Sequence, residues 1–577
     1  MKNFFLSINN ADIKKFKNKK RLILQHNYFL KNQIINFDEV HQIFLKKKEL
    51  KNYLNIIQKN YFIYLDFLSN KLNYLNNTKK SKRFWNILIG PWLIDYLQSM
   101  TRKWIEIKKI SNKNKIFFNF YFSNKRYIPE DYIDYDEFIR NEKVYTEIYS
   151  DILKNYQKKN KEIYKSYFIK NYFHKFSKIE NIPSLRKIIL NFLSFFKLKK
   201  KSNLMIINSY MGHFKEILLY LKTLTFPFFM TNLNDVRNLY YHNSQPHNFL
   251  LRKKILNDFK TKNNYELFLK ENFKNFFPKS YLENFKKFDL MSKNIHPKKT
   301  NFIITAVDHF SYDNLKYWIG NQVLQGSKLF TIQHGANPGY SLFTENEFND
   351  KVISDINFTW GWNDNFKSTK KSFFSFKKIK NNVKKRKHLL IVIPGNIAVQ
   401  KNIKSNLNFY DNLNFYNIFI PLIKKIYKKY SKELVVRLPK ARQVMTNKFY
   451  EHELKKISKN IKIDKNEMFT KSLEESKAVI TSWDQTVFLQ SLNANIPTFA
   501  YWNKQNSIVN DKSLKFFLEL EKKSILFNNA NELINILKAN YYNIDSWWAN
   551  QKRHKITKKF VNQYCRDGNI VEHLADI

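Results

Sequence analysis

The stretch that decides the fold is Asn301–Gly335, NFIITAVDHFSYDNLKYWIGNQVLQGSKLFTIQHG. Two short apolar runs within it, at 301–307 and 328–332, have the length and composition of buried strands. Apolar side chains recur at helical spacing between them, which predicts a helix over about 313–324. A strand, a helix and a second strand in this order are typical of a parallel sheet with a crossover helix.

The same alternation continues on both sides of this stretch and predicts two α/β units. The first unit begins with a strand at 204–207 and a helix at 214–224, and its last strand lies at 358–362. Residues 363–387 are rich in Lys, Ser and Asn, with little periodicity, and predict a linker. The second unit has predicted strands at 389–393, 434–438, 461–463, 478–481 and 497–500, with helices at 410–430, 448–458 and 486–492.

The predicted fold class is therefore α/β, a pair of Rossmann-type parallel-sheet domains with helical additions at both ends. Residues 1–200 form a mainly helical N-terminal region, and 201–365 form the first Rossmann-like domain. A linker at 366–387 leads to the second domain, 388–577, which ends in helices. Ligands of such sheets bind at the carboxyl ends of the strands, so the predicted site lies between the two domains.

Composition narrows the class of protein. The chain has 577 residues, of which 43% are hydrophobic and 17% aromatic, so it can bury a large core in two or three domains. Its only cysteine excludes a disulfide framework and a cysteine-based zinc site. We see no apolar stretch long enough to span a membrane, and the N-terminus lacks the pattern of a signal peptide. We expect a cytoplasmic protein, peripheral at the inner face of the cytoplasmic membrane.

The charge of the chain is extreme, with 101 Lys and Arg against 48 Asp and Glu. Only 13 of the basic residues are Arg, and Lys is spread along the whole chain instead of forming one stripe. Biased codon usage explains this pattern better than nucleic-acid binding, so no nucleic-acid partner is expected. A cationic surface nevertheless attracts an anionic membrane surface and phosphorylated substrates.

The first domain carries its candidate residues where two predicted strands end. Gln333, His334 and Gly335 follow one strand, in a 42-residue window that holds five of the nine glycines. A His at such a position can bind an anion or move a proton, or it can merely satisfy a loop carbonyl. Asp308 and His309 follow the other strand and form a second acid–base candidate, although Asp308 is equally suited to cap a helix.

An acidic cluster follows the Gln-His-Gly stretch. One of Glu345, Glu347, Asp350 and Asp355 could serve as a general base, and a solvated loop is the alternative. The nearby Trp360-Gly361-Trp362 predicts core and interdomain packing more than sugar stacking.

The second domain offers a phosphate-sized site between a strand and a helix. Hydroxyl groups of Ser482 and Thr486, with the backbone N–H groups at the helix start, are suited to a phosphate, and a plain N-cap is the alternative. Arg437 and Lys440 flank the end of the neighbouring strand, where two cations would neutralise a nucleotide phosphate. Gly395 follows the first predicted strand of this domain, and we expect it to lie in a turn that faces the same cleft.

Several familiar motifs are missing. The chain has no GxGxxG, no Walker A loop and no HExxH, and Asp134-Tyr135-Asp136 is a lone DxD with no strand before it. We therefore expect no metal and no cofactor apart from a nucleotide-linked substrate.

Three stretches together resemble the bacterial surface-polysaccharide (O-antigen-type) transferases, over roughly residues 25–505. The first is Ser81–Leu93 (SKRFWNILIGPWL). The second is Gln333-His334-Gly335, followed by Glu345, Glu347, Asp355 and Thr359–Trp362. The third is Thr486–Leu492, followed by Asn495–Thr498. That family is similar to capsule-polysaccharide glycosyltransferases with a GT-B arrangement, in which two Rossmann-like domains face a cleft. Gln490 stands where the family usually has Glu, and its amide can still bond ribose hydroxyls, without charge.

The resemblance implies transfer of a sugar from a nucleotide-activated donor to a surface glycan or its lipid-linked precursor. Three alternatives to a glycosyltransferase remain open. They are a polyol-phosphate transferase, an inactive glycan-binding relative and, from another class, a basic nucleic-acid-binding protein. We assign His334 to the reacting centre, with either Glu347 or Asp308 beside it. The remaining assignments are Gln333, Gly335, His309, Glu345 and Asp355 to the acceptor substrate, and Arg437, Lys440, Ser482, Thr486, Gln490 and Gly395 to the nucleotide.

Overall fold

The computed structural model describes residues 2–24, 45–112, 114–123, 127–156, 161–169, 201–225, 244–293, 295, 297–376, 379, 382–393, 401–403, 419–439, 444–483, 485–502 and 508–576. The predicted nucleotide-binding residues Lys440 and Gly395 lie outside these ranges.

The first Rossmann-type domain is built on a five-stranded parallel sheet with strand order β5-β6-β7-β8-β9. This confirms the parallel sheet predicted from residues 301–335. The last strand lies inside the segment predicted as a linker, because three residues that carry two lysines have no apolar signature. The strands are β5 (Lys201–Ile207), β6 (Lys299–Thr305), β7 (Lys328–Ile332), β8 (Ile356–Thr359) and β9 (Thr369–Lys371).

The second domain has a six-stranded parallel sheet with strand order β12-β11-β10-β13-β14-β15. Counted from the first strand of the domain, this order is 3-2-1-4-5-6, that of a dinucleotide-binding Rossmann sheet. Its topological switch point lies between β10 and β13, where such sheets bind ligands. The strands are β10 (His388–Val392), β11 (Leu434–Arg437), β12 (Lys462–Ile463), β13 (Ser476–Ser482), β14 (Thr498–Tyr501) and β15 (Leu526–Phe527).

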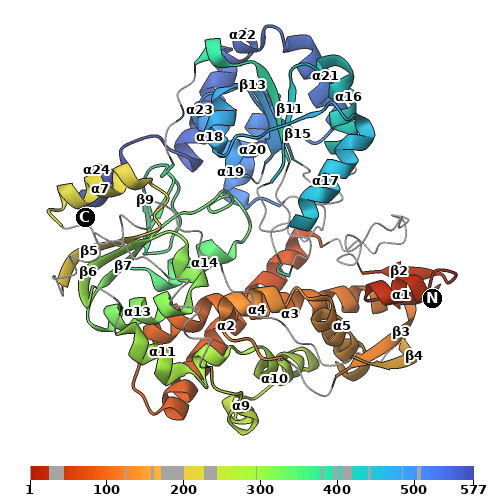
Figure 1. Ribbon diagram of the computed structural model, residues 1–577, viewed down its shortest axis with the longest axis vertical. Coiled ribbons are helices and arrows are strands. Elements are labelled where there is room, and N and C mark those ends of the chain that lie inside the picture. The colour runs from red at the N-terminus through yellow and green to blue at the C-terminus, as the bar shows by residue number, and fades with distance from the viewer. Residues whose placement is uncertain are drawn as a thin grey trace.

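Helices cover both sheets, and Figure 1 shows the blue second domain above the green first domain. Apolar residues at helical spacing seat each helix on its sheet, as Leu422, Ile423 and Ile426 do in the second domain. The helices of the first domain are α7 (His213–Lys222), α12 (Asp308–Ser311), α13 (Asp313–Leu324) and α14 (Glu345–Ile353), and those of the second are α16 (Ile420–Tyr430), α17 (Val444–Ile457), α18 (Phe469–Glu474) and α19 (Thr486–Asn493).

The N-terminal region is mainly helical, as predicted, and its centre is two antiparallel 30-residue helices. Residues Leu50, Leu54, Ile57, Tyr61 and Leu65 recur at helical spacing along the first of them and are buried. The second of the two helices is buried along almost its whole length, so it forms the core on which the other elements pack. The helices of this region are α1 (Asn10–Lys15), α2 (Lys47–Asn76), α3 (Lys82–Ser111), α4 (Tyr132–Phe138) and α5 (Glu142–Asp151).

A third parallel sheet, with order β2-β1-β3-β4, flanks these helices and was not predicted. Its central pair joins strands more than a hundred residues apart, and such a pairing leaves no local sequence signal. The strands are β1 (Lys2–Ser7), β2 (Arg21–Ile23), β3 (Asn114–Phe122) and β4 (Lys161–Phe168).

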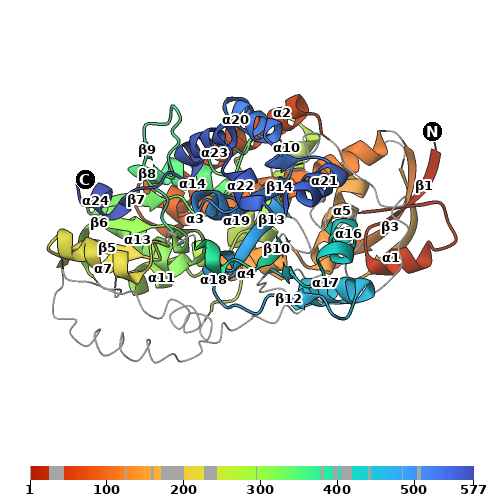
Figure 2. The same cartoon turned by 90° about the horizontal axis from the view of Figure 1, so that it is seen from above.

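The chain ends by crossing back to the first domain. Ile570, Val571 and Leu574 of the last helix pack with strands β5 to β8 and with α7. Figure 2 shows this helix beside α7, at the edge of the molecule away from the second domain. The C-terminal closure is helical as predicted, apart from β15, and consists of α20 (Asp511–Lys522), α21 (Ala530–Asn540), α22 (Ile544–Trp548), α23 (Gln551–Tyr564) and α24 (Ile570–Ala575).

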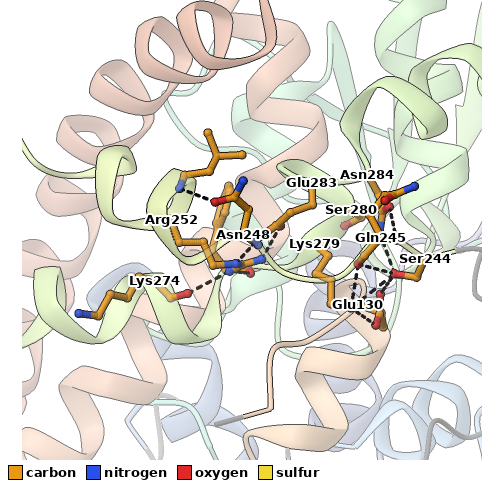
Figure 3. Close-up of polar contacts among 12 residues, drawn as sticks. Glu130, Ser244, Gln245, Asn248, Arg252, Lys274, Lys279, Ser280, Glu283 and Asn284 are labelled. Carbon is orange, nitrogen blue, oxygen red and sulfur yellow. Dashed lines mark hydrogen bonds and ion pairs between the residues drawn. The ribbon is translucent and has the colours of Figure 1, made fainter. Parts of the chain in front are cut away.

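Between β5 and β6 the chain forms a helical layer against the N-terminal helices. Two hydrogen bonds join Arg252 to Glu283 in an ion pair that is nearly inaccessible to solvent (Figure 3). Lys279 forms a second ion pair with Glu130. These contacts tie α9 to the segment between α10 and α11, and tie that segment to Glu130 of the N-terminal region. The elements of this layer are α9 (Phe249–Ile255), α10 (Asn264–Phe276) and α11 (Phe285–Ser292).

Candidate active site between the two Rossmann-type domains

The carboxyl edges of the two large sheets meet directly. The backbone N–H of Ala336, just after β7, donates a hydrogen bond of 3.1 Å to Oγ1 of Thr486, at the start of α19. Gly335 takes a positive φ of 78°, which L side chains rarely adopt, and a Cβ there would lie 3.9 Å from the same oxygen. The sequence-predicted turn and the sequence-predicted helix start therefore belong to one site.

His334 lies in this turn and is half-buried beside the loop that follows β5. Its ring lies 4.5 Å from the ring of Tyr210, which follows β5. Burial lowers the pKa of His334 to about 4, and the nearby His309 acts in the same direction. At neutral pH the imidazole is uncharged and can accept a proton.

The loop after β5 is held in an uncommon backbone conformation. Asn208 and Tyr210 both have positive φ values, 44° and 60°, which bulky residues adopt only under constraint from their surroundings. The amide of Asn208 donates 3.1 Å to Asp308 after β6, so this loop also fixes the position of that carboxylate. Sequence analysis missed Tyr210, since a strained loop next to a site has no local motif.

His309 is buried behind His334 and does not face solvent. Its Nε2 lies 2.8 Å from Asp350 of α14, and its Nδ1 lies 3.3 Å from Oγ1 of Thr305. Burial raises the pKa of Asp350 above its ordinary value, although the bond with His309 opposes that shift. This pair is a positioning element behind the site, and the predicted role of His309 in substrate binding stays a prediction.

Gln333 ties two strand ends together. Its Oε1 accepts hydrogen bonds from the Trp360 backbone N–H at 3.0 Å and from Nε1 of Trp362 at 2.8 Å, and its amide donates to the Gly335 carbonyl. Both Trp side chains are buried in a cluster that spans the two domains, which confirms the predicted packing role of this segment.

The two acidic candidates at and after α14 have strong partners. Glu347 accepts from the Gly339 backbone N–H at 3.0 Å and pairs with Lys351. Asp355 lies at the amino end of β8, where Arg83 binds it through two nitrogens, at 2.6 and 3.1 Å. The amino end of β8 is the opposite edge of the sheet, so this geometry favours a structural role for Asp355.

Glu345 lies elsewhere, on a cavity of about 250 Å³ between α3, α4 and α14. Its Oε1 accepts 2.8 Å from the amide of Asn402, in the short described segment 401–403 beyond β10.

In the second domain, the loop from β13 to α19 lies at the switch point, as the predicted phosphate site requires. Thr481 and the backbone N–H of Ser482 both contact the side chain of Gln485. Gln490 is buried one turn into α19. Ser482 thus lies at the end of β13, with Thr486 and Gln490 on the helix that follows it, and Thr486 contacts the loop after the Gln-His-Gly turn.

Arg437 points away from this loop. Its Nη1 pairs with Asp464 and donates to Ser472 at 2.9 Å and to the Asn466 carbonyl at 3.0 Å. These contacts connect β11 to the loop after β12. They favour a structural role for this guanidinium, and its predicted contact with the nucleotide stays a prediction.

Within the described ranges, no group of three His, Cys, Asp or Glu side chains is arranged to hold a metal ion. The helices of that part of the chain include none with the length and hydropathy needed to cross a membrane.

The structure resembles several solved proteins at low similarity. S. aureus MnaA in complex with UDP has 11% identity and a TM-score of 0.36, covering 65% of this chain and 95% of that one. Acinetobacter baumannii MurG has 11% identity and a TM-score of 0.33, with 65% and 98% covered. Anabaena HepE with UDP and glucose has 9% identity and a TM-score of 0.34, with 66% and 98% covered.

A comparison with curated proteins found no match. The assignment of two Rossmann-type domains in a GT-B-like arrangement follows from the strand orders and from the meeting of the two carboxyl edges. The pattern of one transferase family matches residues 9–575, nearly the whole chain. The chain belongs to the LIC12162 family of transferases.

Proposed function

We propose that the protein transfers a sugar from a nucleotide-activated donor to a surface polysaccharide or to its lipid-linked precursor. The observation that carries the proposal is the contact of Ala336 with Thr486 between two parallel-sheet edges. Each edge is a ligand-binding edge of its own sheet, so a donor held on one lies next to an acceptor held on the other.

The second domain holds the donor in this proposal. The loop at the switch point and the start of α19 present hydroxyl and backbone N–H groups to a diphosphate, and the helix dipole favours its negative charge. Gln490, buried in the same helix, is the candidate partner for the ribose hydroxyls. The nucleotide-sugar is itself the substrate, and the proposal includes no metal or other cofactor.

His334 acts as the base in the first domain. The acceptor hydroxyl attacks the anomeric carbon while the bond from that carbon to the diphosphate oxygen breaks. The hydroxyl proton passes to the neutral imidazole, and the leaving diphosphate stays bound at α19. Asp308, held by Asn208, is the carboxylate after the neighbouring strand that would orient the acceptor. Glu347 is less suited, because Lys351 neutralises it.

The acceptor and the membrane belong to the same proposal. A lipid-linked precursor would lie at the inner face of the cytoplasmic membrane, and the formal charge of +53 would attract its anionic lipids.

The test is a thermal-shift screen of CMP-, CDP-, UDP-, GDP- and dTDP-linked sugars and polyols, with and without EDTA. We expect one nucleotide class to raise the Tm of the wild-type protein, by an amount that grows with ligand concentration. Thr486→Val keeps the side-chain shape and removes the hydroxyl, so it should weaken binding about tenfold to a hundredfold, as expected for a hydrogen bond to a charged group.

The matched control is Thr557→Val, which removes a buried hydroxyl of α23 that bonds only the Arg553 carbonyl of its own helix. It should bind the nucleotide like the wild type. A screen in which no nucleotide raises the Tm would contradict the proposal, and stabilisation by CDP-linked polyols alone would redirect it to polyol-phosphate transfer.

A further inference from the structure

A surface helix of the first domain, α7, is apolar on two faces. On one face Leu219 is fully buried, in a cluster that includes the strands of the sheet and the last helix, α24. On the other face Phe214, Ile217 and Leu221 recur at helical spacing and are exposed, Phe214 by 75% and Leu221 by 64%. Leu224 follows the helix and is 97% exposed. We call these four exposed residues the α7 stripe.

Such a stripe needs a partner outside the described part of the chain. A helix that is apolar on all sides is normally buried in a core or a membrane, and only one face of α7 packs on the sheet. Single exposed apolar side chains are ordinary, whereas a row of them marks an interaction surface. Helix α7 lies at the outer edge of the first domain (Figures 1 and 2), so this face is accessible from outside the molecule.

The charges on the helix indicate what kind of partner fits. Lys215 and Lys222 lie on α7, and Nζ of Lys222 is 3.4 Å from Glu572 of α24. The only acidic residue of α7, Glu216, is buried and accepts 2.7 Å from the hydroxyl of Ser209. An apolar row accompanied by cations is typical of a helix that lies in the interface of an anionic bilayer. A second copy of the chain fits less well, because each copy has a formal charge of +53 and repels the other.

The stripe begins beside the proposed reacting centre. Tyr210, four residues before Phe214, is exposed, and its ring lies 4.5 Å from the ring of His334. Helix α7 starts at the carboxyl edge of the sheet, where β5 ends, and runs away from that edge. A sugar whose lipid anchor lies in a bilayer against the stripe would therefore be close to His334.

We propose that the α7 stripe inserts into the interface of an anionic membrane, and that the acceptor is a lipid-linked precursor taken from that membrane. The inference rests on the proposed function and chooses between the two acceptors named there. The charge of the whole chain attracts anionic lipids without orienting the protein. The stripe supplies the apolar contact that determines which face of the molecule meets the bilayer.

The experiment is cosedimentation of the full chain with vesicles of mixed phosphatidylglycerol and phosphatidylcholine at physiological salt. The wild-type protein should bind these vesicles. The double variant Phe214→Ser with Leu221→Ser should bind them about tenfold more weakly or worse, because two apolar side chains no longer insert. This variant keeps every charge, so a loss of binding reports the apolar contact and not the general attraction. Both positions are exposed, so its Tm should stay close to that of the wild type.

The matched control is Phe249→Ser with Leu250→Ser. These two residues are similarly exposed on α9, at a different edge of the molecule (Figure 1), and this variant should bind vesicles like the wild type. Hydrogen–deuterium exchange of the wild-type protein needs no variant. Vesicles should slow the exchange of residues 213–224.

Several outcomes would overturn the inference. They are a wild-type protein that does not bind the vesicles, an α7 variant that binds normally, an equal loss in both double variants, and unchanged exchange at 213–224. A wild-type dimer that becomes a monomer in the α7 variant, with vesicle binding unchanged, would make the stripe an interface between copies. The nucleotide-dependent Tm shift is measured on the same samples, and the α7 variant should retain it. If the nucleotide raises the Tm but no vesicles bind, the proposed function stands and this inference fails.

Discussion

At the scale of single residues, the protonation of His334 gives the sharpest prediction. Burial and the neighbouring His309 lower its pKa to about 4, so the imidazole stays neutral well below pH 6.5. We expect kcat/KM to be unaffected by the protonation of His334 between pH 5.5 and 8. At lower pH it should fall with an apparent pKa near 4.

The measurement is the pH profile of kcat/KM over the range in which circular dichroism shows a folded protein. His334→Asn should reduce the rate about 10²- to 10⁴-fold, the usual contribution of a general base. An acid limb near pH 6.5 that is lost in His334→Asn would contradict the environment described for this residue.

A second titrating residue affects stability. Burial lowers the pKa of Lys103 in α3 to about 7, from about 10.5 in an unfolded chain. Between these values the unfolded state binds more protons, so this residue makes stability rise with pH from about 7 to 10.5. Below pH 7 the buried, charged Lys103 destabilises the folded state by its full amount.

Lys103→Met should therefore raise the Tm most at or below pH 7 and progressively less towards pH 10. Thermal unfolding at several pH values measures this difference, with the exposed Lys82→Met as a control that should show little pH-dependent change. A Lys103→Met effect that is constant with pH would show that the ammonium is not desolvated.

Sequence could locate residues at strand ends but not their distant partners. Gln333, His334, Gly335 and Thr486 were predicted because each directly follows a strand or begins a helix. Asp350 as the partner of His309, and Arg83 as the partner of Asp355, depend on contacts far apart in sequence.

At the scale of elements, the buried ion pair between α9 and the loop before α11 makes a testable contribution. Arg252 gives four hydrogen bonds, two to Glu283 and two to the carbonyls of Lys274 and Phe277 (Figure 3). Removing one partner leaves the other charge buried and unpaired, which typically costs about 3–5 kcal/mol.

Arg252→Met and Glu283→Gln should accordingly lower the midpoint of thermal or urea unfolding clearly. Lys559→Met, which removes an exposed pair with Glu519, should change it little. If the Arg252 variant unfolded at the wild-type midpoint, this layer would not be held by the pair.

The elements themselves were predicted unevenly. Buried strands such as β7, at 328–332, were found at their true bounds because both faces are apolar. The short polar β9 and the N-terminal sheet were missed, since edge strands and long-range pairings carry weak patterns. The predicted helix at 410–430 agrees with α16 over 420–430, and 410–418 lies outside the described residues.

At the scale of the whole molecule, several contacts join the two Rossmann-type domains. One is that of Ala336 with Thr486, and the chain also connects the domains through the return of α24 to the first sheet. Aromatic residues from both domains, among them Tyr340, Trp483 and Phe517, pack in one cluster at the junction. This shared cluster holds the two carboxyl edges together at the junction.

The central claim is that a nucleotide-sugar held at the start of α19 lies against the Gln-His-Gly turn of the first domain. Hydrogen–deuterium exchange with and without the stabilising nucleotide-sugar tests it most directly, because it reports the two edges in a single measurement. We predict slower exchange both at residues 332–340 after β7 and at residues 481–490 around the start of α19. Protection confined to one of these segments, or found at neither, would contradict the account.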